Sequence, residues 1–165
     1  MNELACDILI VGGGTGGTAA ALALADKGLK VVLTEPTDWI GGQLTSQAVP
    51  PDEHPWIEQC GCTRRYRHFR EMVRATYRRD ENLTDEARRN FRLNPGGGWV
   101  SHLCHSPAVG HRVLQEMLKP ALHSGLTLLL HHQPVSASVD GDEIKSVTLR
   151  NTESDSDITV WAKFF

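Results

Sequence analysis

Three glycines at a fixed spacing are the residues of this sequence with the most specific chemistry. Gly12, Gly14 and Gly17 form the pattern Gly-x-Gly-x-x-Gly, with Thr15 and Gly16 inside it. Between a strand and a helix, such a loop turns tightly, lets a pyrophosphate approach the backbone and lets the helix pack closely on the strand. The first amides of the helix then face the phosphate charge. We therefore predict a pyrophosphate-binding loop; the alternative is a glycine-rich turn without a ligand.

An acidic residue follows this loop at the distance that a nucleotide site requires. Glu35 lies 23 residues after Gly12. At the end of a strand, its carboxylate can accept hydrogen bonds from both hydroxyls of an adenosine ribose, and it would repel a 2′-phosphate. The pattern favours an adenine dinucleotide other than NADP.

The residues around both motifs predict the β-α-β unit that has to position them. Residues 6–11 and 30–35 are short apolar, β-branched runs, which are typical of parallel strands buried on both faces. Between them, residues 18–27 form an alanine-rich helix with Gly28 as its C-cap. Two parallel strands joined in this way require a right-handed crossover.

A second glycine pair indicates which dinucleotide is bound. Gly41 and Gly42 follow the acid and precede Gln43. Many flavoproteins have such a pair, whose backbone approaches the flavin side of the cofactor, whereas NAD-dependent dehydrogenases usually lack it. The pair favours FAD and leaves an NAD-dependent dehydrogenase as the weaker alternative.

Four segments of the chain match a known family when they are taken together. They are DILIVGGGTGG, the strand that ends in Glu35-Pro36, WIGGQLTSQAVPPDE and NPGGGWVSHLCH. In these segments the chain resembles a bacterial family of FAD-dependent oxidoreductases with a two-dinucleotide-binding-domain, glutathione-reductase-like FAD fold. The resemblance extends from Asp7 to about Phe164. A broad superfamily shares the first segment, whereas the last two segments are specific to a smaller group of proteins.

The resemblance implies FAD as the cofactor, hydride transfer from a small organic substrate, and a set of cofactor contacts. The glycine motif would hold the pyrophosphate and Glu35 the adenosine ribose. Other contacts are expected from Pro36 near the adenine, from Gly41, Gly42 and Gln43 further along the cofactor, and from the backbone of Val135, at the end of the third strand, to the adenine. No residue receives a catalytic assignment.

The remaining sequence predicts an inserted helical segment and the completion of the α/β domain. Residues 63–79 have helical periodicity, Thr84 is a candidate N-cap, and Ser106-Pro107 is a helix start. Four further strands are expected at residues 126–130, 135–139, 144–150 and 158–164, of which the last three form an antiparallel meander.

The expected fold is therefore α/β, a Rossmann-like FAD-binding domain. Its parallel sheet has three strands, the meander packs on this sheet, and a helical segment is inserted. The predicted division is residues 1–42, 43–105 and 106–165.

Family members continue beyond the meander into a strand that passes close to the flavin, then a substrate domain and a C-terminal FAD-contacting segment. We therefore expect an incomplete chain whose partners would be the missing C-terminal half or a second copy. Three functions remain open: the FAD-binding portion of an oxidoreductase, a non-catalytic remnant that binds adenine dinucleotides, and, least favoured, an NAD-dependent dehydrogenase.

The cysteines and two histidines leave several alternatives open. Cys60 and Cys62 form a CxC pair that could be redox-active near a flavin, or could join Cys104, His102 and His105 as metal ligands. Because metal sites usually show clearer paired spacing, we predict no metal and ordinary thiols. The two histidines would lie either in the substrate or flavin pocket or at a partly exposed position.

Charge and composition limit the remaining classes of partner. Ten of the twelve arginines lie between Arg64 and Arg92, while the net charge of the whole chain is −3. The face shared by Arg67, Arg70, Arg74 and Arg78 is expected to be solvated. We predict no nucleic-acid or membrane partner. The absence of an export signal, together with four cysteines, favours the cytoplasm.

Overall fold

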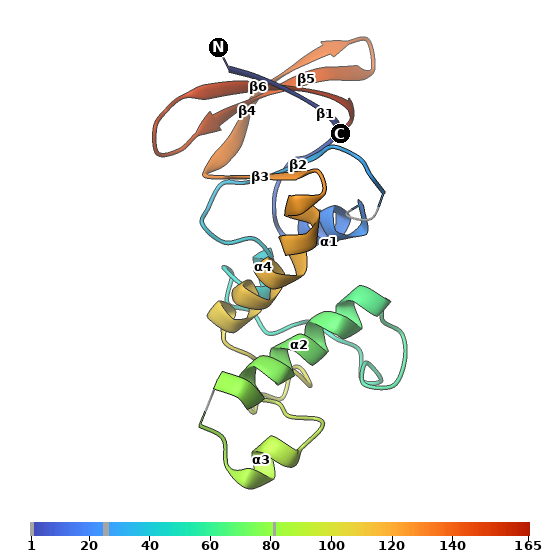
Figure 1. Ribbon diagram of the computed structural model, residues 1–165, viewed down its shortest axis with the longest axis vertical. Coiled ribbons are helices and arrows are strands. Elements are labelled where there is room, and N and C mark those ends of the chain that lie inside the picture. Colours follow the sequence, from blue (N-terminus) through green and yellow to red (C-terminus); the bar gives the residue numbers. More distant parts are fainter. Residues whose placement is uncertain (1, 25–26, 81) are drawn as a thin grey trace. The chain divides into compact units, whose positions relative to one another are not determined.

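The protein is described here by a computed structural model that covers residues 2–24, 27–80 and 82–165 (Figure 1). Its contacts divide the chain into two compact units. The first unit runs to Gly42 and resumes at Leu118, and the second comprises Gln43–Met117. The second boundary falls inside a helix, whereas the sequence-based division places it before that helix.

A six-stranded sheet forms the first unit, in the order β3-β2-β1-β6-β5-β4. The strands are β1 (Asn2–Ile10), β2 (Val31–Glu35), β3 (Leu126–Leu130), β4 (His132–Asp140), β5 (Glu143–Asn151) and β6 (Asp157–Phe164). Strands β3, β2, β1 and β6 run parallel, and β6, β5 and β4 are antiparallel. The predicted α/β fold with a parallel sheet and a meander is confirmed.

The prediction had the meander pack on the parallel sheet, whereas in the structure the meander extends this sheet. Its last strand, β6, pairs in parallel with β1, with Ala5 opposite Trp161. The open edge of β1 thus receives its backbone hydrogen bonds from the meander, and one continuous sheet results. A sequence pattern marks the strands but does not say which edge each strand joins.

The core of the first unit is made by strands from both parts of this sheet. Leu9 and Val32 of the parallel strands form one buried cluster with Val147, Leu149 and Val160 of the meander. All five residues of β2 are buried. This confirms the prediction, made from the apolar run, that the strand is covered on both faces. Helix α1 (Thr15–Leu24) contacts β1 and β2. The prediction extends this helix to residue 27, but residues 25–26 lie outside the described residues; Gly28, the predicted C-cap, has φ of +67°.

The second unit is built from helices and long loops. A short helical turn (Gly42–Leu44) leads into it, followed by α2 (Arg64–Asp80), α3 (Asp85–Arg89) and most of α4 (Pro107–His123). The predicted N-cap is confirmed, because the Thr84 hydroxyl accepts a hydrogen bond from the Ala87 amide at 3.2 Å. Helix α4 begins at Pro107, as predicted, and continues through Pro120 to its end.

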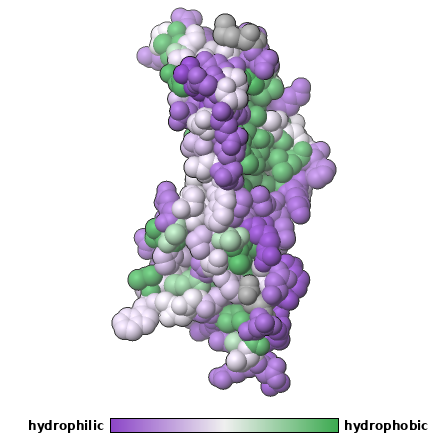
Figure 2. Space-filling view, turned by 90° about the vertical axis from the view of Figure 1, so that its left-hand side faces the viewer, coloured by the Kyte–Doolittle hydropathy of each residue, from purple (hydrophilic) through white to green (hydrophobic). Residues whose placement is uncertain are grey.

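The surface is mixed in polarity. On the face shown in Figure 2, hydrophobic side chains reach the surface in separate patches among hydrophilic ones. Large exposed apolar side chains of the second unit include Phe91, Trp99 and Val100. Among the described helices, none is long and apolar enough to cross a membrane.

Candidate functional site

The glycine loop (Gly12–Gly17) joins the end of β1 to the start of α1. Gly12 has φ of +102°, a conformation that side chains disfavour, and its amide donates to the Thr34 hydroxyl at 3.1 Å. A side chain at Gly17 would collide with the Gly12 carbonyl oxygen. The tight turn and the close packing of helix on strand therefore need the glycines that the motif supplies.

Open space lies beside the other two glycines of the loop. A Cβ atom added at Gly14 or Gly16 would meet no atom within 4 Å. Because α1 starts at Thr15, the amides of its first turn have no partners within the helix. These positions form a cradle of backbone N–H groups at a helix N-terminus, an arrangement that binds phosphate groups.

The second glycine pair packs directly on this loop. The Gly41 amide donates to the Gly13 carbonyl at 2.7 Å, and the Thr15 hydroxyl donates to the Gly41 carbonyl at 2.8 Å. A Cβ at Gly42 would lie 3.0 Å from the Gly14 Cα and 3.1 Å from the Thr15 amide nitrogen. Two motifs that are separate in sequence therefore form one backbone structure.

Glu35 ends β2 beside the loop, and only 7% of it is exposed. One carboxylate oxygen, Oε1, accepts hydrogen bonds from the Thr37 amide (3.0 Å) and the Thr37 hydroxyl (2.7 Å). These bonds orient the carboxylate. The other oxygen, Oε2, would lie 3.0 Å from a Cβ at Gly13.

Three residues of this site escaped the sequence analysis. Gly13 must lack a side chain because Glu35 packs against it, and Thr34 and Thr37 hold Gly12 and Glu35 in place. The run of three consecutive glycines was a signal for Gly13. The two threonines lie within two residues of Glu35 in the sequence, but only the fold shows which atoms they contact.

The other predicted contact residues lie at more varied positions. Pro36 is exposed directly after Glu35. Gln43 belongs to the second unit, where its side-chain amide donates to the Pro50 carbonyl at 3.5 Å. Val135 lies inside β4, not at the end of β3. A register shift between Pro134 and Ser136 leaves Val135 without a Cα partner in β5.

These observations fit the adenosine diphosphate part of FAD. The cradle at Gly14 and Gly16 would hold the pyrophosphate, and the oriented Glu35 carboxylate would accept the ribose hydroxyls. Side chains at either glycine would fill the space that the phosphates need.

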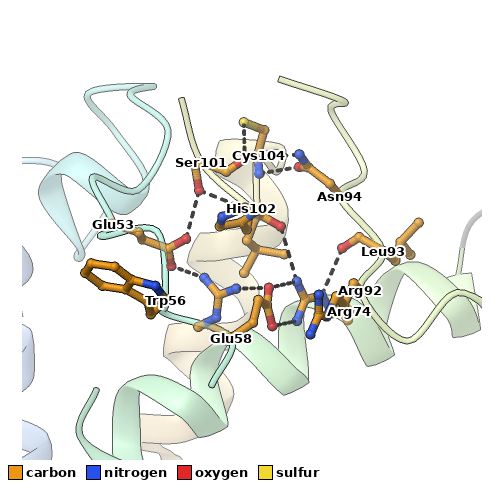
Figure 3. Close-up of polar contacts among 12 residues, drawn as sticks. Glu53, Trp56, Glu58, Arg74, Arg92, Leu93, Asn94, Ser101, His102 and Cys104 are labelled. Carbon is orange, nitrogen blue, oxygen red and sulfur yellow. Dashed lines mark hydrogen bonds and ion pairs between the residues drawn. The ribbon is translucent and has the colours of Figure 1, made fainter. Parts of the chain in front are cut away.

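The second unit contains a different polar site, a charge cluster formed by Glu53, Glu58, Arg70 and Arg74 (Figure 3). Arg70 pairs with both glutamates, and Arg74 pairs with Glu58. Arg70 is 3% exposed and Arg74 is 6% exposed. The prediction of a solvated arginine face is therefore wrong for these two residues, because acids from an upstream loop cover them.

The charge cluster holds several loops of the unit against α2. The Arg74 guanidinium also donates to the carbonyls of Leu93 (2.9 Å) and His102 (3.2 Å). Ser101 donates its hydroxyl hydrogen to Glu53 at 3.0 Å. Burial, together with the nearby charge of Arg74, lowers the pKa of Arg70 to about 10, so the guanidinium stays protonated at neutral pH.

Tyr66 belongs to the same environment. Its hydroxyl donates to Glu53 at 2.6 Å. Burial raises the pKa of this hydroxyl to about 12, and the nearby Cys62 adds to the effect. The phenol therefore remains a hydrogen-bond donor throughout the physiological range. Phe69 and Val73 of α2 are buried as well.

The cysteines and the two histidines do not gather into one site. Cys60 is exposed, Cys62 is half-buried and Cys104 is buried, and all are free thiols. The ring nitrogens of His105 lie 3.2 Å from the carbonyls of Leu103 and Leu44, and burial lowers its pKa, whereas His102 is exposed. Within the described ranges, no group of three or more His, Cys, Asp or Glu residues could hold a metal ion.

Known proteins resemble this chain over very different lengths. The family described as FAD dependent oxidoreductase matches residues 7–165. The 4-oxocyclohex-2-ene-1-carboxylate 5-dehydrogenase of Sinomonas cyclohexanicum is 49% identical over 47 residues, which are 28% of this chain and 8% of that protein. The flavin-containing amine oxidase B of Cavia porcellus is 53% identical over 38 residues, which are 23% of this chain and 7% of that protein.

Solved structures extend the likeness to almost the whole chain. The glycerol-3-phosphate dehydrogenase from Bacillus halodurans, complexed with FAD, superposes with a TM-score of 0.55 at 16% identity. The match covers 96% of this chain and 33% of that chain. The likeness at this identity concerns the fold, and this chain spans about a third of the length of that structure.

Proposed function

This chain belongs to the family of FAD-dependent oxidoreductases, and we propose that its first unit binds the adenosine diphosphate half of FAD within an enzyme that oxidises a small organic substrate. The observation that supports this best is the packing of Gly41 and Gly42 on the glycine loop, next to the oriented carboxylate of Glu35. A plain NAD-binding loop needs no second glycine pair.

In this proposal the chain's own residues bind and orient the cofactor. The amides at the start of α1 face the pyrophosphate, Glu35 accepts the ribose hydroxyls, and the backbone of Val135, at the register shift of β4, contacts the adenine. Bound FAD supplies the hydride acceptor of the reaction. We assign no catalytic residue.

We propose that the protein is cytoplasmic, because its four cysteines are free thiols. The substrate is proposed to be a small organic molecule, in keeping with the family. A further domain or a second copy of the chain remains a predicted partner.

The test is a titration of the purified chain with FAD and with ADP, in which binding is measured by calorimetry. Retained flavin is measured by absorbance after desalting. Gly14→Val should weaken the binding of both ligands about tenfold or more, because its side chain fills the phosphate cradle. Ala23→Val, at an exposed position later in α1, is the matched control and should bind as the parent does.

A second variant tests the ribose contact. Glu35→Gln should weaken FAD and ADP to the same extent, since both contain the adenosine ribose. The proposal fails if the parent chain binds neither ligand, or if Gly14→Val binds them as tightly as Ala23→Val.

A further inference from the structure

The second unit contains a cavity of about 230 Å³ along α2, which we call the arginine pocket. Its lining includes Arg67, Arg70, Arg74 and Arg78, which are spaced three, four and four residues apart and share one face of the helix. All the residues that line the pocket belong to the second unit. The pocket is therefore a feature of this unit alone, and the FAD proposal does not depend on it.

The four arginines have two different roles. Arg70 and Arg74 are buried and are held by Glu53 and Glu58 in the charge cluster. Arg67 is exposed, and its guanidinium makes no hydrogen bond or ion pair with any residue that the structure describes. Arg78 donates to the Asn90 carbonyl, a neutral acceptor, at 2.8 Å. The pocket therefore has two arginines that form no ion pair with a described carboxylate.

The charge balance of the pocket remains positive. Its lining has four guanidinium groups against the carboxylates of Glu58 and Glu71. If Glu53, which pairs with Arg70, is included, one positive charge is still in excess. The guanidinium of Arg92 lies 5.3 Å from the centre of the Phe91 ring and adds a further positive charge beside the lining.

One part of the lining is apolar. Phe91 is 75% exposed although its ring lines the pocket, and buried Ile57 lines it as well. An exposed aromatic ring beside unneutralised arginines suits a ligand that has both an apolar body and an anionic group. Inorganic phosphate would use the arginines but would gain nothing from the ring.

We propose that the arginine pocket binds a small organic carboxylate, with the anionic group on Arg67 and the apolar body against Phe91. Arg70 and Arg74 are held in place by the glutamates, so the positive excess of the lining comes from Arg67 and Arg78. Arginine is well suited to this contact because its planar fork can donate two parallel hydrogen bonds to one carboxylate.

Benzoate and inorganic phosphate are the probes that test this proposal, by calorimetry or by NMR titration at low ionic strength. Benzoate should bind saturably and more tightly than phosphate. Arg67→Gln should weaken benzoate about tenfold or more, because it removes a charge-assisted contact. Arg89→Gln is the matched control: it makes the same change at an exposed position of α3 in the same unit and should leave the affinity unchanged.

A second variant examines the apolar wall. Phe91→Ala should weaken benzoate several-fold and leave phosphate unchanged. The proposal is overturned if benzoate shows no saturable binding, if Arg67→Gln and Arg89→Gln weaken it equally, or if phosphate binds as tightly as benzoate and Phe91→Ala has no effect. Far-UV circular dichroism of each variant confirms that the unit stays folded. Because Arg67 and Phe91 are exposed, we expect no loss of structure.

Discussion

The first unit presents backbone groups to its proposed ligand, whereas the polar site of the second unit consists of charged side chains. In the glycine loop, the space beside Gly14 and Gly16 is open, and the glycines keep it free of side chains. In the charge cluster, two glutamates and two arginines satisfy one another away from water. A backbone site depends on the shape of the chain. A side-chain site depends on every partner being present, because a buried charge that loses its partner is costly.

This contrast predicts that the two sites respond differently to single substitutions. The largest effect is expected for Arg70→Met, which leaves the carboxylate of Glu53, of which 1% is exposed, without its cation. The free energy of unfolding should fall by about 3–5 kcal/mol, measured by urea denaturation. The double variant Glu53→Leu/Arg70→Met should recover part of this loss, since no unpaired charge remains. An equal loss in both variants would show that packing, not charge, accounts for the effect.

A smaller effect is expected in the glycine loop, where shape is at stake. Gly17→Ala places a Cβ against the Gly12 carbonyl and should lower the free energy of unfolding by about 1–3 kcal/mol, as overpacking does. Gly16→Ala, where a Cβ meets nothing within 4 Å, is the neighbouring control. It should leave stability unchanged or raise it slightly, because alanine favours the helix. Similar losses in both variants would remove the distinction between a close contact and an open cradle.

The smallest effect concerns pH and the second unit alone. Burial is the main cause that lowers the pKa of His105 below its ordinary value of 6.5, so the unfolded chain takes up this proton more readily than the folded chain. Stability should therefore fall as the pH drops from about 6.5 toward the lowered pKa. In His105→Gln this part of the pH dependence should disappear, which urea midpoints at several pH values would show. An unchanged slope would mean that other groups cause the acid sensitivity.

The α/β elements were predictable because their signals are local. Residues 126–130 were predicted as a strand from a short apolar run, and β3 has those bounds. Helix α2 was expected at residues 63–79 and runs from Arg64 to Asp80. The N-cap at Thr84 is equally local, because one hydroxyl and one amide three residues later are sufficient.

The errors share one physical cause, which is that periodicity groups residues by face but does not say what covers the face. Arg70 and Arg74 lie on one side of α2 as predicted, yet Glu53 and Glu58 reach them from the loop before the helix. The pairing of β6 with β1 joins segments more than 150 residues apart. No local pattern encodes such pairings.

By itself, the sequence determined the tight glycine turn between β1 and α1 and the acid that ends β2 beside it, on which the proposed pyrophosphate and ribose contacts rest. Both depend on residue types that a short β-α-β unit positions without help, since glycine alone allows the turn at Gly12 and the contact at Gly17. Only the tertiary structure decided that Gly41 and Gly42 pack on that loop, that the meander extends the sheet, and that two arginines are buried while Arg67 is left unpaired within the described chain. These outcomes depend on which distant segments come to lie together, and burial then turns the same side chain from a solvated charge into a structural one.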